Sequence, residues 1–510
     1  MEVATSPVTA DKTSWSYLPA EIRILILECV LQDGCSLAGF AIVSLEWQMI
    51  IEPHNFARIK LTSSRLADFG PMIHRNRALV HYIWLCLELQ KYDCTACATH
   101  SYLKLANTPN PDAALVATAL QDVLSTLSTW KPNGELLLDI SVHSPSDSEH
   151  WFKYLTFEPD LPSDECSLSL CTEQSTLANF DDHQHGWISG SQNSPPPERA
   201  FYKLFDTIID IRDKIRWSCP LEEVDRLPLV PAVTGLLLRQ QTRRRWRPNE
   251  LQLILECFPR LQDLYYEPWR QWEDFSQKLI DRYIQSLLKY LGNCKLRRLT
   301  IFENFAERYP ASFKNPFLPC SPTRIPEDSI SRAVADKSRK FEYLSASFIV
   351  DASYFFNACK PHWKWPSMTS LTLTSRLLTP DENPVAIDDM LQQAAAVAMK
   401  MPNLKSMEIW NGRKGLAMLF RYHLTSEGVV LALRGTWPFA LRPPIVQAWE
   451  NVAPKHCSHN PIVVEEMLDA DVIKSHGDAI HHLKFLDPVI RPISLRQIRM
   501  EHRVREGLHG

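Results

Sequence analysis

A short hydrophobic pattern recurs along the chain and predicts β-strands. In each copy an apolar residue is followed by two others, a second apolar residue, one other and a third apolar residue. The copies begin at Val80, Val233, Leu261, Leu296, Met368 and Leu404, with a weaker copy at Phe341. Short apolar runs of this kind are typical of strands buried in a parallel sheet. From Val233 onward the copies lie 27 to 45 residues apart, which leaves room for a helix between them.

Helical patterns fill several of these intervals. Apolar residues recur at every third or fourth position over 251–258, 279–291 and 390–401, and this spacing predicts helices. A unit of one helix and one strand cannot bury its own apolar face, so neighbouring units must stack. The strand pattern resembles that of leucine-rich repeats. We therefore predict a mixed α/β fold with an irregular leucine-rich-repeat-like α/β solenoid. A plain α/β domain with parallel strands is the alternative.

The first sixty residues follow a different pattern, which predicts a small helical unit. Apolar side chains share one face of its first helix, namely Leu18, Ile22, Leu25, Ile26 and Cys29. A second apolar stretch begins at Leu37 and extends to Phe56. So short a unit buries too little surface to be stable by itself. Its remaining apolar surface therefore predicts a binding partner.

The order of residues in this unit resembles an F-box. Leu18-Pro19-Ala20-Glu21-Ile22 opens the unit, and Val43-Ser44-Leu45-Glu46-Trp47 follows about 25 residues later. The resemblance implies an all-helical F-box that docks onto a Skp-type adaptor. The residues divided between adaptor contact and F-box core would be Leu18, Pro19, Ile22, Ile26, Leu37, Val43 and Trp47. Many F-boxes carry basic residues after the Ser and the Trp, where this sequence has Leu45 and Gln48.

The arrangement of the whole chain resembles fungal F-box proteins with an irregular leucine-rich-repeat-like C-terminal region. This resemblance implies the substrate receptor of a Skp–cullin–F-box ubiquitin ligase. The F-box would bind the adaptor and, through it, a cullin–RING ligase, while the repeat region would bind an unknown protein target. The alternative is a non-ligase scaffold or interaction protein that uses the F-box-like helices as a structural cap, and Leu45 and Gln48 favour it.

Composition and charge narrow the classes of function. With 510 residues the chain exceeds the usual size of a single core, so several units are expected. A net charge of −4 indicates neither a nucleic-acid nor a membrane partner. No apolar run approaches the length of a bilayer span and no signal peptide is visible, so we expect a location in the cytoplasm or nucleus. No phosphate-binding loop or catalytic motif is found, which predicts a non-catalytic protein without cofactors.

A run of basic residues is the best candidate for contact with a target. It comprises Arg243, Arg244, Arg245, Trp246 and Arg247, just after the predicted strand at Val233. Arginines beside an exposed tryptophan would hold a phosphate or an acidic peptide. The run would then lie at the rim of the solenoid. A solvated connecting loop is the alternative.

Cysteine and histidine spacing gives one weak metal candidate. Cys94, Cys97 and His100 have zinc-like spacing, but a structural zinc site takes four ligands. A tight turn is therefore favoured, and we predict no metal. His183 and His185 follow Asp181 and Asp182, and this group is interpreted as a solvated loop.

Proline-rich and polar stretches divide the chain into segments. The predicted segments are a disordered tail over 1–13, the F-box over 14–60, the first strand and helix units over 61–157, a flexible linker or long loop over 158–200, the irregular leucine-rich-repeat-like domain over 201–490 with a long loop over 306–340, and a basic C-terminal tail over 491–510. Low apolar content in the linker cannot easily offset the entropy lost on ordering.

Overall fold

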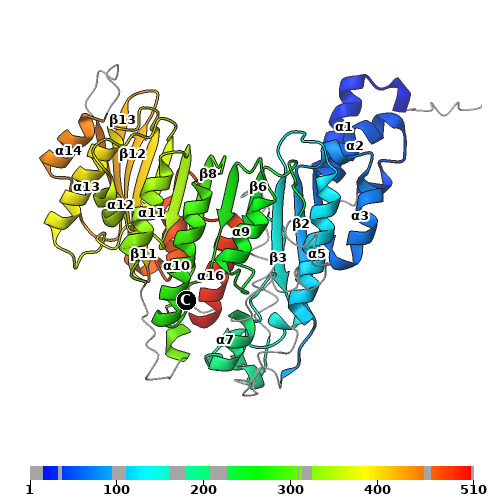
Figure 1. The fold of residues 1–510 in the computed structure, drawn as a ribbon, viewed down its shortest axis with the longest axis horizontal. Coiled ribbons are helices and arrows are strands. Elements are labelled where there is room, and N and C mark those ends of the chain that lie inside the picture. The colour runs from blue at the N-terminus through cyan, green and yellow to red at the C-terminus, as the bar shows by residue number, and fades with distance from the viewer. Residues whose placement is uncertain are drawn as a thin grey trace, which may run out of the picture.

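The computed structural model describes residues 15–32, 37–94, 111–160, 180–205, 227–292, 294–307, 309–312, 324–452 and 461–506. Its main feature is one large sheet, whose twelve strands lie in the order in which they occur along the chain (Figure 1). The strands are β1 (Arg58–Thr62), β2 (Tyr82–Glu88), β3 (Leu137–His143), β6 (Gly235–Leu238), β7 (Asp263–Tyr266), β8 (Arg298–Phe302), β9 (Tyr343–Ser347), β10 (Ser370–Thr374), β11 (Ser406–Arg413), β12 (Leu416–Leu424), β13 (Val429–Gly435) and β14 (Ile462–Met467). A separate hairpin pairs β4 (Trp187–Ile188) with β5 (Ser191–Gln192).

The sheet is parallel from β1 to β11, and its register explains the repeated sequence pattern. The middle apolar residues of successive copies lie opposite one another, as Leu264, Leu299, Leu344 and Leu371 do. All seven predicted strands are confirmed, as β2 and β6 to β11. The pairing changes after β11, because β12 and β13 are antiparallel to their predecessors and β14 is parallel to β13.

One face of the sheet is covered by a layer of helices that share a continuous apolar core with the strands (Figure 1). They are α3 (Leu66–Ile73), α5 (Pro111–Ser128), α9 (Pro248–Glu256), α10 (Asp274–Leu291), α11 (Asp328–Ser338), α12 (Ala352–Ala358), α13 (Pro384–Ala398) and α14 (Pro443–Glu450). The helices predicted over 251–258, 279–291 and 390–401 are confirmed as α9, α10 and α13, with boundaries shifted by a few residues. The mixed α/β class with a large, mostly parallel sheet is thus established.

The opposite face of the sheet is polar but equally buried. Asp139, Thr300, Thr372 and Glu408 point away from the helical layer, and each is at most 2% exposed. Two parts of the chain cover this face, one made of residues 144–160 and 180–205 and the other of residues 468–506. They contain α7 (Glu198–Phe205), α15 (His476–Leu483) and α16 (Pro492–Glu506), and short 3-10 turns at Pro145–Asp147, His183–His185 and Ala470–Val472. Burial of both faces is what a parallel sheet requires.

Parts of the segments predicted as a linker over 158–200 and as a long loop over 306–340 are ordered. Residues 180–200 are no flexible linker, because Trp187 is fully buried in an aromatic cluster with Phe201. The segment 306–340 contains α11. The remaining parts of these two predictions, over 161–179 and 313–323, lie outside the described residues. The basic C-terminal tail forms α16, which packs on the polar face. The segments 61–157 and 201–490 contribute to one sheet, since β3 pairs directly with β6.

A helical unit precedes β1 and lies at one end of the sheet (Figure 1). It consists of α1 (Ala20–Gln32) and α2 (Leu45–Ala57), with 3-10 turns at Trp15–Tyr17 and Leu37–Gly39. Further 3-10 turns occur at Ser63–Arg65, Arg77–Leu79 and Tyr309–Ser312. The strand β1 begins inside the predicted 14–60 segment, at Arg58. The predicted tail over 1–13 lies outside the described residues.

Candidate functional site

The N-terminal unit, residues 15–57, has a very small core of its own. Leu27 of α1 and Ile51 of α2 are fully buried, and Leu37 joins them from the connection between the helices. Trp47 packs on this core, with its ring centroid 5.2 Å from that of Trp15. The unit therefore holds its two helices together with few buried side chains.

Polar contacts at the start of α1 fix the geometry of the unit. The carboxylate of Glu46 accepts hydrogen bonds from the Trp15 indole at 3.0 Å and from Arg23 Nε at 2.8 Å. These contacts, led by the indole hydrogen bond, hold the pKa of Glu46 below its usual value. Ser44 caps α2 by accepting a hydrogen bond from the backbone N–H of Trp47 at 3.3 Å. The face that α1 presents outward is thus held in one orientation.

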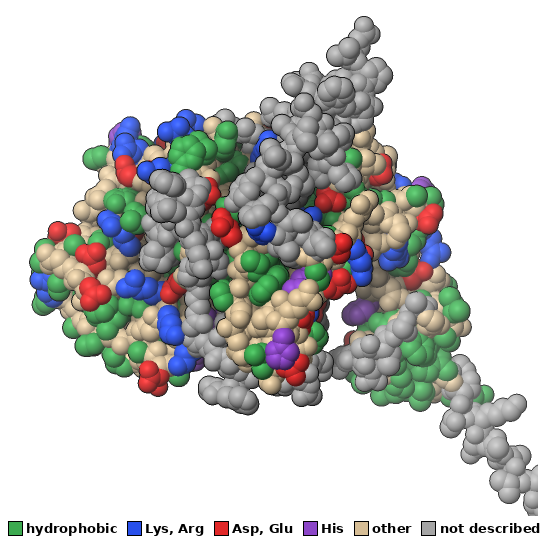
Figure 2. Space-filling model, turned by 90° about the horizontal axis from the view of Figure 1, so that it is seen from below, with side chains coloured by type: hydrophobic (Ala, Val, Ile, Leu, Met, Phe, Trp, Pro, Cys, Tyr) green, Lys and Arg blue, Asp and Glu red, His purple; other side chains and the backbone are tan. Residues whose placement is uncertain are grey.

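That outward face is apolar and exposed. On α1 the exposed fractions are 36% for Leu18, 42% for Ile22, 54% for Leu25 and 37% for Ile26. Adjacent apolar side chains on the connection and α2 are also exposed, namely Phe40, Ile42, Val43, Leu45 and Met49. Figure 2 shows hydrophobic side chains gathered at the right-hand end of the molecule, where Figure 1 places α1 and α2. A helix that is apolar on nearly all sides is normally covered, so this docking face is a candidate binding site.

The structure divides the seven residues that were assigned to adaptor contact and F-box core. Leu18, Pro19, Ile22, Ile26 and Val43 are exposed on the docking face. Leu37 is only 7% exposed and belongs to the small core. Trp47 is half-buried beside the core. The docking face also includes Ile42 and Met49, which sequence reasoning missed because they lie outside the regular helical spacing.

The expectation of an exposed arginine cluster is wrong. Arg243, Arg244, Arg245 and Trp246 are at most 8% exposed, and only Arg247 reaches the surface. Arg243 pairs with Glu501 of α16 at 2.8 Å. Arg244 binds both carboxylate oxygens of Asp147, at 2.5 and 2.8 Å. Buried charges are tolerated only with partners, so these arginines hold the covering segments to the sheet and offer no free surface to a target.

A neighbouring ion pair extends this buried network to the middle of the polar face. Arg239 and Asp139 lie 2.8 Å apart and their side chains are fully buried. The Tyr82 hydroxyl donates a hydrogen bond to the same carboxylate at 2.5 Å. Burial raises the pKa of Asp139, while Arg239 and Tyr82 oppose that shift. The network joins β2, β3 and the residues after β6 into one polar layer.

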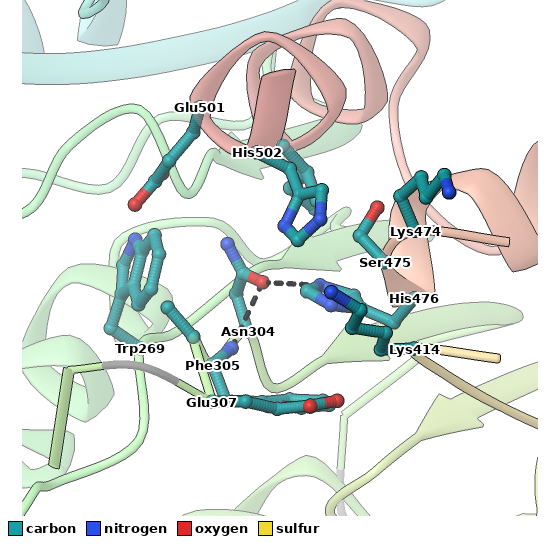
Figure 3. Close-up of a pocket in the computed structure, with 12 residues that line it drawn as sticks. Trp269, Asn304, Phe305, Glu307, Lys414, Lys474, Ser475, His476, Glu501 and His502 are labelled. Atoms are coloured by element: carbon teal, nitrogen blue, oxygen red, sulfur yellow. Dashed lines mark hydrogen bonds between the residues drawn. The ribbon is translucent and has the colours of Figure 1, made fainter. Parts of the chain in front are cut away.

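A cavity of about 60 Å³ lies between the loop after β8, the start of α15 and α16 (Figure 3). Within it Asn304 Oδ1 accepts hydrogen bonds from His476 Nε2 and from the Phe305 backbone, both at 2.9 Å. Burial lowers the pKa of His476 to about 3, so the ring is neutral near pH 7. Lys414 and Lys474 also line the cavity, together with Glu307 and Glu501.

The hydroxyl of Ser475 in this cavity serves a structural role. It donates a hydrogen bond to Asp478 at 3.1 Å and accepts one from the Asp478 backbone at 3.2 Å, which caps α15. The adjacent His476 is engaged with Asn304. A nucleophile paired with a base would require a hydrogen bond between the serine and the histidine. Among the described contacts Ser475 and His476 form no such pair.

The weak metal candidate is placed only in part. Cys97 and His100 lie outside the described residues. Cys94 follows β2, and its Sγ lies 3.4 Å from Nε2 of His185, which was interpreted as part of a solvated loop. His185 is in fact buried.

Together these features define a mixed α/β protein with a large, mostly parallel sheet and an exposed apolar helical face. A family model described as "Family of unknown function (DUF6546)" matches residues 293–491, which is less than half of the chain. The match includes β8 to β14 and ends at the residue before α16. No curated protein matches the chain. In the described parts of the chain, no helix has both the length and the apolar character needed to cross a membrane.

Proposed function

We propose that this protein is an F-box substrate receptor of a Skp–cullin–F-box ubiquitin ligase. The N-terminal unit would be the F-box and would bind a Skp-type adaptor. A protein target would bind the repeat region, and catalysis would belong to other subunits. The exposed apolar docking face, formed by residues that also carry the F-box resemblance, is the observation that carries this proposal.

The docking face favours a partner over a purely structural role for the unit. A structural cap at the end of a stacked array has a polar outer face, because that face meets water. Here Ile22, Leu25 and Val43 are between 42% and 58% exposed. An apolar helical surface of this kind is suited to helices of another protein, which would lie against it. The alternative, a non-ligase scaffold with an internal cap, leaves this surface without a role.

The order of the strands supports the leucine-rich-repeat-like solenoid as the target-binding part. Each parallel strand from β1 to β11 neighbours the next one along the chain, and a helix accompanies most of them. Stacked units of this kind present an extended surface. Since Arg243 and its neighbours are buried, we place target contact at the cavity lined by Lys414 and Lys474. The ligase would act by holding a lysine of the target near the ubiquitin-loaded enzyme.

Binding to a purified Skp-type adaptor tests the proposal. Single variants Ile22→Asp and Leu25→Asp place a charge in the docking face, and each is expected to weaken binding by about 2 kcal/mol or more, roughly thirtyfold. The matched control is Val385→Asp on α13, where an apolar side chain is 50% exposed on a different surface. This control should bind like the wild type. Affinity is measured by isothermal titration calorimetry with each chain shown to be folded by circular dichroism.

The possible results separate the two candidate functions. Binding by the wild type and the control, together with loss in both docking-face variants, supports the receptor. A folded wild-type chain that shows no binding to the adaptor would leave only the scaffold. Equal binding by the wild type and all three variants would mean that the adaptor contacts a part of the chain other than α1.

A further inference from the structure

Three metal-ligating side chains from distant parts of the sequence meet beside the polar face of the sheet. Cys94 follows β2, His150 lies in the segment after β3, and His185 precedes the β4–β5 hairpin. Their ligand atoms all lie within 4.8 Å of one another. The distance of 3.4 Å between Cys94 Sγ and His185 Nε2 is close to the roughly 3.6 Å between sulfur and nitrogen ligands of a tetrahedral zinc ion.

A carboxylate orients one of the two histidines. Asp182 Oδ2 lies 2.7 Å from His185 Nδ1, and the other oxygen of Asp182 accepts a hydrogen bond from the His185 backbone at 3.3 Å. A proton held on Nδ1 leaves the Nε2 lone pair directed toward Cys94. Metal-binding histidines commonly have such a carboxylate behind them. Lys153 is the other partner of Asp182, at 3.0 Å.

The histidines are also buried and held side by side. His150 is 9% exposed and His185 6%, and their rings are nearly parallel with centroids 5.2 Å apart. Two stacked imidazoles lie beside a thiol in a partly buried site. This arrangement is expected of a metal site and is not expected of a solvated loop.

We propose that Cys94, His150 and His185 bind a zinc ion. One thiolate and two imidazoles, whose ligand atoms converge within 4.8 Å, form a ligand set typical of Zn²⁺. On binding, the Cys94 thiol releases its proton to solvent and the sulfur forms the bond to the metal. The ion would join the end of β2 to the segment that covers the polar face. Because a tetrahedral zinc ion has four ligands, one further ligand would complete the site.

Zinc content of the full chain, purified without chelators and dialysed after addition of zinc chloride, tests this site. One zinc per chain is expected for the wild type, and less than one-tenth of that for Cys94→Ser and for His185→Asn. The matched controls are Cys29→Ser, an exposed thiol on α1, and His183→Asn, an exposed histidine two residues from the site. Both controls should retain the wild-type content.

A second variant keeps the test valid if removal of a ligand unfolds the chain. Asp182→Asn keeps the shape of the side chain but weakens its hold on His185, and it should lower zinc affinity by about ten- to a hundredfold. Substitution with Co²⁺ should give a charge-transfer band from the thiolate, absent in Cys94→Ser. A wild-type chain without zinc overturns the proposal. Equal zinc content in the wild type, Cys94→Ser and His185→Asn would also overturn it, since the metal would then be adventitious.

Discussion

The helices α1 and α16 reverse the usual relation between composition and burial. In α1 nine of the thirteen side chains are apolar, yet Ile22 and Leu25 are exposed. In α16 most side chains are polar or charged, yet Ser494 and Gln497 are at most 2% exposed. The polar helix finds its partners within the chain, because Gln497 bonds to Thr156 and Tyr154. The apolar helix has no comparable cover among the described residues.

The largest effect is expected on the polar side of this comparison. Glu501→Ala removes the buried carboxylate that pairs with Arg243 and accepts hydrogen bonds from Tyr154 and Tyr309. A buried arginine left without its partner should lower the free energy of unfolding by about 3 to 5 kcal/mol. Urea denaturation measures the change. The control Asp328→Ala breaks an exposed pair with Arg332 and should change stability by less than about 1 kcal/mol. Equal effects would mean that α16 is held by its apolar contacts.

A smaller effect is expected inside the N-terminal unit, where two leucines of α1 provide a matched pair. Leu27→Ala empties the small core and should destabilise the unit by about 2 to 3 kcal/mol, near the lower end for a buried leucine. Leu25→Ala removes an exposed side chain and should change stability by less than about 0.5 kcal/mol. Hydrogen exchange of the α1 amides measures the change in stability of the unit in each of the two variants. If Leu25→Ala were the more damaging change, the docking face would be covered in the free protein.

The smallest effect concerns pH and the buried His476. Its pKa is lowered to about 3 by burial, so only the unfolded chain binds a proton there between about pH 6.5 and 3. Stability is therefore complete above about pH 6.5 and falls as the pH is lowered. At pH 5.5 the loss from this residue is about 1.4 kcal/mol. His476→Gln, which can still donate to Asn304, should remove that part of the pH dependence in urea titrations at pH 8 and 5.5.

The exposed His362 offers a control for the pH experiment. The variant His362→Gln should keep the wild-type pH dependence. A pH dependence in His476→Gln identical to that of the wild type would mean that His476 is accessible to protons in the folded chain.

The sequence predicted the part of the fold that depends on local pattern. The seven strand copies were recognisable because Leu264, Leu299 and their equivalents must stack in register. The strand β3 was missed because Asp139 interrupts its apolar run, and this residue is acceptable only through Arg239, 100 residues away. The order of residues 180–200 was missed for the same reason, because polar residues there, such as Gln192, are paired with partners that no local pattern identifies.

For the candidate binding face too, the sequence predicted what depends on local pattern and not what depends on long-range packing. Helical spacing identified the apolar face of α1, since Leu18, Ile22 and Ile26 repeat at intervals of four. It could not show that Leu37 turns inward, because this depends on how α1 and α2 pack. Spacing identified Cys94 but not the other two proposed metal ligands, since Cys94 and His185 are 91 residues apart. Only the fold brings them together.

The position of α16 in the sequence has a consequence for synthesis of the protein. Arg491, just before this helix, pairs with Asp160, which is made 331 residues earlier. At about 5 to 20 residues per second, a ribosome needs roughly 15 to 70 s to cover that distance. During this time the strands can pair and gain their helical layer, but the polar face of the sheet lacks the cover that residues 468–506 later provide. Asp160 and its neighbours are therefore open to water, and to chaperones, until translation is well advanced.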